Sequence, residues 1–164
     1  MELDAPIPGA PNFTMRELTR TSHRAYLDDN RNVPEPMIQA GYALAEQLQI
    51  IRDHYRKPLI VHSAYRCPPL NRAIGGSRTS QHMKFEAADF HVAGVSLQAT
   101  FAWIVKDSGM EWGQLIREGW DPAAGDLSWL HISLGPFWRP AHKSQQVLDF
   151  SIRTGRYTVY QGPR

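Results

Sequence analysis

The sequence predicts an α+β protein with a small, largely antiparallel sheet and flanking helices, an organisation typical of hedgehog/DD-peptidase-like folds. Helical patterns dominate the first half of the chain and strand patterns the second half, and this segregation is typical of the α+β class. The 164 residues fit one domain with a single hydrophobic core. We therefore treat residues 1–164 as one domain, in which residues 1–12, rich in Pro and Gly, form an N-terminal arm.

Several segments are predicted to be helical. Thr14 and Glu17 have the spacing of a capping box, which indicates a short helix at this point. Residues 21–34 are polar and predict a loop. From Glu35 to about Tyr55, apolar residues recur at steps of three and four, which predicts a long helix with one buried face. Further helices are expected near residues 69–74 and 97–106.

Strands are indicated by short apolar runs between turn-forming residues. They are expected at residues 59–61, 86–92, 113–117, 129–134, 147–152 and 157–160. The last two runs flank Thr154 and Gly155, so they are predicted to form a hairpin.

Composition excludes several classes of protein. The net charge is only +2 and the basic residues are scattered, so we expect no nucleic-acid partner. The single cysteine, Cys67, rules out an intrachain disulfide, and it has no neighbouring base that would favour a nucleophilic role. No signal peptide is visible and no apolar stretch approaches the ~20 residues that cross a bilayer. We expect a monomer without a membrane span that is made in the cytoplasm and reaches other compartments only by release or another export route.

Two residues near the middle of the chain have the character of metal ligands. Asp89 lies in an apolar strand, where a carboxylate needs a metal, a cation or hydrogen-bond donors to offset its desolvation. His82 precedes that strand on a loop from which its imidazole can reach the same point. The alternative is a carboxylate bound to backbone groups and an unrelated surface histidine.

A third candidate ligand lies later in the sequence. His131 alternates with Leu130 and Ile132 in a predicted strand, so its side chain faces the opposite side from theirs. Taken together, His82, Asp89 and His131 form a three-ligand set for Zn²⁺ with one position left open, as in catalytic zinc sites. The alternative is that His131 is an ordinary histidine of a half-buried strand. His91, which shares a strand face with Asp89, is another possible ligand or a partner of a ligand.

The segment Ser63-Ala64-Tyr65-Arg66 supplies a candidate anion-binding group. Arg66 follows the end of a predicted strand, and its guanidinium can bind a carboxylate or a developing oxyanion with paired hydrogen bonds. The alternative is an arginine that faces solvent.

The order of these motifs resembles a known family. SAYR, N-x3-GG, SQH-x6-DF and W-x-H-x-S follow one another as in the zinc D-alanyl-D-alanine carboxypeptidase family, which has the hedgehog/DD-peptidase fold. The similarity extends from FTMRELTR to WLHIS, and the chain most resembles the small proteins of phages and prophages. The resemblance implies that His82, Asp89 and His131 bind zinc. It also implies that Arg66 orients the substrate, and we assign Tyr65 and Ser80 of the same motifs to substrate binding.

The sequence departs from the family pattern at two positions. Phe85 stands where relatives usually have Gly, and a large side chain there can strain the backbone or obstruct the cleft. Ser128 stands where several relatives have an acidic residue, three positions before the last histidine. Glu118, in a QLI-x-E pattern like that of the phage-type branch, is our first candidate for the general base. Asp126 is the second, and Glu111 is a further acid nearby.

The resemblance implies a zinc metallopeptidase that cleaves D,D- or L,D-type bonds in peptidoglycan peptide stems, as a carboxypeptidase or an endopeptidase. The hypothesis from a different class is a non-catalytic module of the cell wall or of a virion that keeps the zinc fold. Phe85 and Ser128 favour this second hypothesis.

Overall fold

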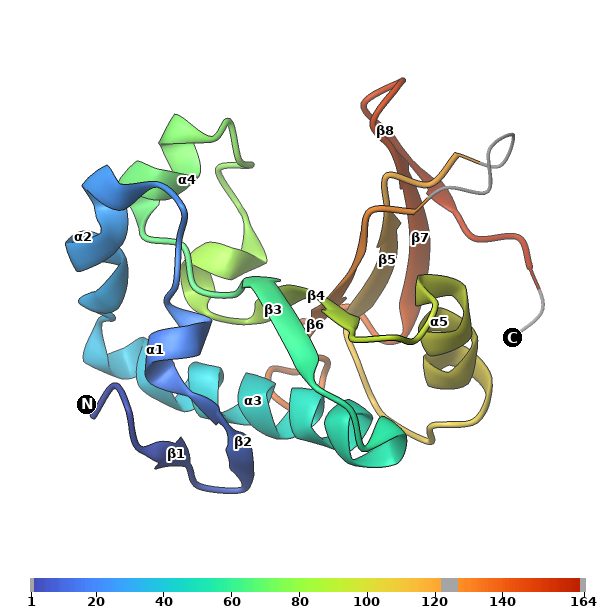
Figure 1. Cartoon of the computed structure of the whole chain (residues 1–164). Coiled ribbons are helices and arrows are strands. Elements are labelled where there is room, and N and C mark those ends of the chain that lie inside the picture. Colours follow the sequence, from blue (N-terminus) through green and yellow to red (C-terminus); the bar gives the residue numbers. More distant parts are fainter. Residues whose placement is uncertain (1, 122–126, 163–164) are drawn as a thin grey trace.

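A computed structural model of the protein describes residues 2–121 and 127–162, and it confirms the α+β class (Figure 1). The strands are β1 (Pro6–Ile7), β2 (Ala10–Thr14), β3 (Leu59–Ser63), β4 (Ala87–Val92), β5 (Gln114–Glu118), β6 (Trp129–Ser133), β7 (Gln146–Ser151) and β8 (Arg156–Val159). The α-helices are α1 (Met15–Leu18), α2 (Leu27–Arg31), α3 (Glu35–Tyr55), α4 (Pro68–Ala73) and α5 (Leu97–Lys106), and the 3₁₀ turns are η1 (Arg24–Tyr26) and η2 (Gln81–Lys84).

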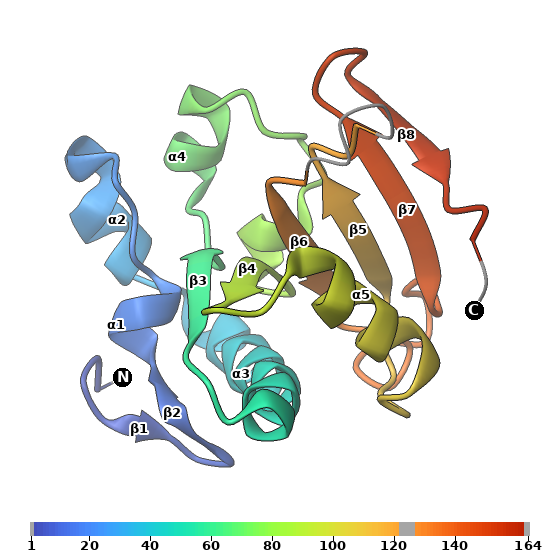
Figure 2. The same ribbon diagram turned by 45° about the vertical axis from the view of Figure 1, so that its right-hand side comes forward.

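Six strands form the main sheet in the order β3-β4-β6-β5-β7-β8. All neighbouring strands are antiparallel except β5 and β7, which run parallel. The expected hairpin at the C-terminus is present as β7 and β8. Strands β4 and β6 are therefore neighbours, although α5 and β5 separate them in the sequence (Figure 2).

The main sheet has one covered face and one open face. Phe90, Leu130 and Ile132 are buried in the hydrophobic core on the covered face, where α3 and α5 contact the strands (Figure 2). The neighbouring residues Asp89 and His131 point to the opposite face because side chains alternate along a strand. The core thus fixes which side chains are left for a site.

The long helix α3 has the predicted bounds, Glu35–Tyr55, and buries Leu44, Leu48 and Ile51. The predicted capping interaction at the first helix is also present, since the Thr14 hydroxyl accepts a hydrogen bond from the backbone N–H of Glu17. Within the described residues, no helix is both long and apolar enough to cross a membrane.

The segment predicted as a polar loop, residues 21–34, instead contains η1 and α2. Its anchor is Asn30, which is fully buried and whose amide group donates to the carbonyl oxygens of Thr19 and Tyr65. The Asn30 side-chain oxygen accepts from the backbone N–H of Cys67. These tertiary hydrogen bonds stabilise a short helix that no apolar periodicity announces.

The segment at residues 6–12, expected to be part of an arm, pairs as the β1–β2 hairpin and packs against α3. Ile7 and Ala10 are buried in the core. Asn12 and Gln49 exchange hydrogen bonds, with the Gln49 side chain donating to the Asn12 side chain and accepting from its backbone N–H.

Phe85 adopts the left-handed conformation that explains why relatives have Gly at this position. Its φ is 61° and its ψ is 29°, a region that costs a non-Gly residue about 1–2 kcal/mol. The ring does not obstruct the cleft, because it is fully buried and packs beside Tyr65, with 5.2 Å between the ring centroids. A Cβ atom at Gly41 of α3 would lie 2.7 Å from the Phe85 ring, so Gly41 provides the space that this ring occupies.

We predict that Gly41→Ala has opposite effects in two backgrounds. In the natural chain it should lower the free energy of unfolding, because the new methyl group meets the Phe85 ring. In a Phe85→Gly background it should raise that free energy by up to about 1 kcal/mol, since alanine has the higher helix propensity and the ring is gone. Urea unfolding of the four proteins measures the coupling, and an equal effect of Gly41→Ala in both backgrounds would contradict it.

Candidate metal centre

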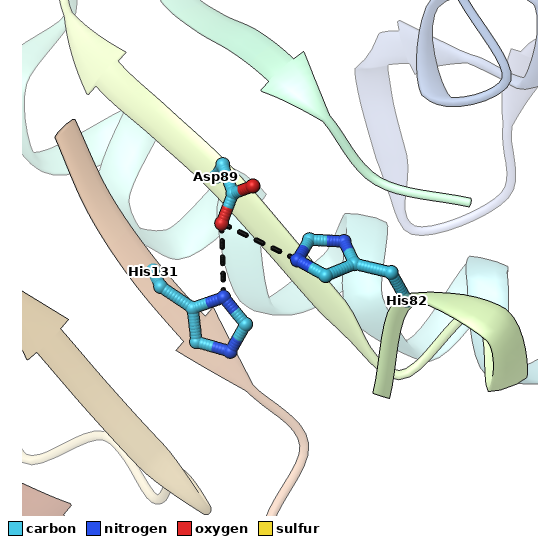
Figure 3. Close-up of side chains that lie close together, drawn as sticks. All are labelled: His82, Asp89 and His131. Atoms are coloured by element: carbon cyan, nitrogen blue, oxygen red, sulfur yellow. Dashed lines mark hydrogen bonds and ion pairs between the residues drawn. The ribbon is translucent and has the colours of Figure 1, made fainter. Parts of the chain in front are cut away.

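Three of the expected ligands meet on the open face of the sheet. One ligand atom from each of His82, Asp89 and His131 lies within 4.8 Å of the other two, and all three residues are buried (Figure 3). The Asp89 carboxylate oxygen Oδ1 lies 2.9 Å from Nδ1 of His131 and 3.3 Å from Nε2 of His82. This is the one group of at least three such residues within the part of the chain that the structure describes.

Strand register brings two of the ligands together. Asp89 of β4 and His131 of β6 are directly paired across the antiparallel ladder. Side chains of directly opposed residues lie on the same face with Cβ atoms roughly 5 Å apart. A shift of one residue in this register would turn His131 to the covered face, so the apolar neighbours of both residues also determine the position of the site.

The third ligand comes from η2, which lies just before β4. A backbone hydrogen bond from Arg66 N–H to the His82 carbonyl, 3.1 Å long, joins this turn to the segment after β3. Nδ1 of His82 lies 2.7 Å from the Ala64 carbonyl oxygen. Because a carbonyl oxygen only accepts, Nδ1 carries the proton and Nε2 presents its lone pair to the site.

Arg66 contacts the other oxygen of the same carboxylate. Its Nη2 donates to Asp89 Oδ2 over 2.6 Å, and its Nε donates to the Ser63 hydroxyl over 2.7 Å. Burial alone would raise the pKa of Asp89, but the charges and hydrogen bonds of His82 and His131 outweigh it and hold that pKa below its ordinary value. Asp89 is therefore ionised at neutral pH, as a metal ligand has to be.

The cluster opens into a cavity of about 700 Å³. Its walls include the three candidate ligands together with Arg66, Ser80 and Glu118. Lys143 and the aromatic residues Trp129, Phe150 and Tyr157 line other parts of it. Sequence reasoning missed these four residues, although the alternation of side chains in β6 and β7 already placed Trp129 and Phe150 on the open face.

Glu118 has the environment of a general base. It ends β5 on the wall of the cavity. Burial raises its pKa to about 7, with a further contribution from the charge of Asp89, while His131 and Arg66 oppose the shift. A carboxylate with a pKa near neutrality is suited to accept and return protons at physiological pH.

Ser128 lies beside Glu118, although the two are ten residues apart in the sequence. The backbone N–H of Ser128 donates to the Glu118 carbonyl over 2.8 Å. The position at which several relatives have an acid therefore adjoins the residue that bears an acid in this chain. This neighbourhood gives a physical reason for the missing acid at Ser128.

Other expected site residues lie elsewhere. Tyr65, for which we expected a substrate contact, is only 2% exposed and packs in the core against Phe85. Glu111 borders a different hollow, next to Gln47 of α3. His91 is hydrogen-bonded to His62, with 2.8 Å between their ring nitrogens, and does not belong to the ligand cluster. Asp126 lies outside the described residues.

A comparison with protein families matches residues 11–120 to the Peptidase M15 model. The chain belongs to the peptidase M15 family. The match includes His82, Asp89 and Glu118 but ends before His131, so only the fold connects His131 to the site. A search of curated proteins gives no match.

The donor atoms of this M15 member fit the zinc ion that M15 peptidases use. Two imidazole nitrogens and one carboxylate oxygen, all from buried residues, are a donor set of catalytic zinc sites. The family and the His-Asp-His cluster together support a zinc peptidase. The cavity beside the cluster leaves room for water or substrate at a remaining coordination position.

We predict about one zinc ion per chain, lost on ligand substitution. His82→Ala and His131→Ala should each lose most of the zinc because two donors remain. His91→Ala, a matched histidine substitution on the same face, should retain it. Elemental analysis after dialysis gives the zinc content, and full zinc in His131→Ala beside loss in His91→Ala would exchange the two assignments.

We also predict a pH-dependent effect of Glu118→Gln on the metal-free protein. The pKa of Glu118 is about 7 in the folded chain against a model value of 4.5, so an ionised Glu118 destabilises the folded state. This destabilisation is absent below pH 4.5, grows between pH 4.5 and 7, and is complete above pH 7. The variant should therefore melt at a higher temperature than the natural chain at pH 8 and at nearly the same temperature at pH 4.5. Equal differences at both pH values would contradict the shift.

Proposed function

We propose that this protein is a zinc metallopeptidase that hydrolyses D,D- or L,D-type peptide bonds in peptidoglycan stem peptides. The observation that carries the proposal is one cavity in which a His-Asp-His cluster adjoins a carboxylate with a pKa near neutrality. Membership of the peptidase M15 family supports peptide hydrolysis. The motif order SAYR, SQH-x6-DF and W-x-H-x-S supports the substrate class.

His82, Asp89 and His131 would hold the zinc ion. A zinc ion in such a site polarises the scissile carbonyl and lowers the pKa of water. In our proposal Glu118 accepts the proton of the attacking water and then donates it to the leaving amine. One residue thus acts as general base and then as general acid, which a pKa near 7 permits in both directions.

Arg66 is proposed to orient the substrate while it holds Asp89. Its hydrogen bonds to Asp89 and Ser63 occupy only part of the guanidinium donor set. The same side chain borders the cavity, so its remaining N–H groups can bind a substrate carboxylate or the tetrahedral oxyanion. Ser80, which also lines the cavity, keeps its proposed substrate contact.

The character of the cavity supports a short peptide with a carboxylate group. Its volume of about 700 Å³ is within the range of small-ligand sites. Arg66 and Lys143 place two cationic side chains on its walls. Stem peptides of peptidoglycan are short and bear carboxylates, so both the size and the charge are complementary.

We predict that Glu118→Gln keeps zinc but lowers the rate of hydrolysis at least ~100-fold, the usual scale of acid–base catalysis. Glu111→Gln, the same substitution outside the cavity, is the matched control and should leave the rate unchanged. Asp126→Asn should change the rate only modestly. A slow Asp126→Asn variant beside an active Glu118→Gln variant would transfer the role of base to Asp126.

The substrate assignment is tested by digestion of purified peptidoglycan followed by mass spectrometry of the products. Product masses identify the bond that is cut and distinguish a carboxypeptidase from an endopeptidase. We expect stem-peptide cleavage by the zinc-loaded protein and none by Glu118→Gln. Binding to peptidoglycan without cleavage by the zinc-loaded natural chain would instead favour a non-catalytic wall or virion module.

A further inference from the structure

Gln81 connects the turn that carries His82 to the strand that carries His131. It is the first residue of η2 and lines the cavity. Its side-chain oxygen Oε1 lies 3.2 Å from Nε2 of His131. Its side-chain nitrogen Nε2 donates to the Ser133 hydroxyl over 3.1 Å. A residue next to one candidate ligand in the sequence thus contacts another candidate ligand that comes from a different strand.

The Ser133 hydroxyl is itself held in place. It accepts a hydrogen bond from the backbone N–H of Gln114 over 2.9 Å. The Ser133 backbone carbonyl also accepts from Gly113 N–H over 2.7 Å. Ser133 is fully buried, so its hydroxyl gives the Gln81 amide a fixed partner. With the amide nitrogen directed to Ser133, the amide oxygen is left facing His131.

This orientation determines which nitrogen of His131 is available as a ligand. An amide oxygen only accepts, so a hydrogen bond to Gln81 requires a proton on Nε2 of His131. Nδ1, which points at Asp89, then presents its lone pair once its own proton is displaced. If the amide were reversed, its nitrogen would donate to Nε2 and the proton of the neutral ring would remain on Nδ1, where it blocks binding.

We propose that Gln81 is a positioning residue that fixes His131 in the tautomer able to bind zinc through Nδ1. The role is parallel to that of the Ala64 carbonyl, which selects Nε2 as the ligand atom of His82. The two histidines would therefore bind through different ring nitrogens, each selected by an acceptor on the far side of the ring. This inference rests on the zinc site of the proposed function.

The test compares zinc affinity among variants of the full chain. Gln81→Leu removes the acceptor and should weaken zinc binding ~10–100-fold, the usual effect of losing a partner of a metal ligand. Gln81→Glu keeps an acceptor oxygen and should bind zinc within a few-fold of the natural chain. Gln81→Asn keeps the amide but withdraws it from reach, and should weaken zinc binding like Gln81→Leu even if the leucine variant folds poorly.

Gln114→Leu is the matched control, because Gln114 lines the same cavity but bonds to Gln146 rather than to a ligand. Zinc dissociation constants come from competition with a chelator, and the visible spectrum of the cobalt-substituted protein reports the coordination geometry. We expect an altered cobalt spectrum in Gln81→Leu and Gln81→Asn only, with metal-free melting temperatures close to that of Gln114→Leu.

Natural zinc affinity and an unchanged cobalt spectrum in Gln81→Leu and Gln81→Asn would overturn the inference. A fall in affinity that Gln114→Leu reproduces, or that Gln81→Glu does not restore, would equally overturn it by indicating a general effect on the cavity. In both cases the natural chain still binds zinc and cleaves its substrate, so the proposed function stands. Failure of the natural chain to bind zinc would instead overturn the proposed function and this inference with it.

Discussion

The carboxylate of Asp89 is the constraint on which the rest of the site depends. Its residue is 5% exposed, in the middle of a sheet whose other face is apolar core. A buried anion of this kind destabilises a protein unless charged or hydrogen-bonding partners surround it. Its partners are His82, His131 and Arg66, which come from three separate segments of the chain. The sheet register and the turns before β4 and after β3 must therefore all be correct at once.

Local chain geometry around Asp89 follows from that requirement. The β3–β4 ladder shifts register between Val61 and Ser63, and Ser63 is thereby paired with Asp89. On the other side, the left-handed conformation at Phe85 ends η2 and turns the chain into β4. The backbone strain at this position is offset by burial of the aromatic ring against Tyr65 and beside Gly41.

The sequence was sufficient to predict the fold class, the bounds of α3 and the residues that form the cluster. Those features depend on periodicity and on residue types whose burial has few chemical explanations, such as Asp89 within an apolar strand. The helix at Leu27–Arg31 was not predictable in this way because its stability comes from Asn30, whose partners are distant in the sequence. The orienting contact of Gln81 was hidden for the same reason, since Ser133 and His131 approach it only in the folded sheet. Tyr65 shows the converse error: motif membership suggested a substrate contact, but side-chain direction places it in the core.

The pairing of β4 with β6 also affects when the site can form during synthesis. His131 follows Asp89 by 42 residues, with α5 and β5 between them. A nascent chain that has exposed only its first hundred residues carries His82 and Asp89 but lacks the third donor, too few ligands for a stable zinc site. Capture of the ion must then wait until β6 has left the ribosome and paired with β4, because loop closure has to precede this long-range contact. Metal content in the cell would accordingly report how much of the protein has completed its sheet.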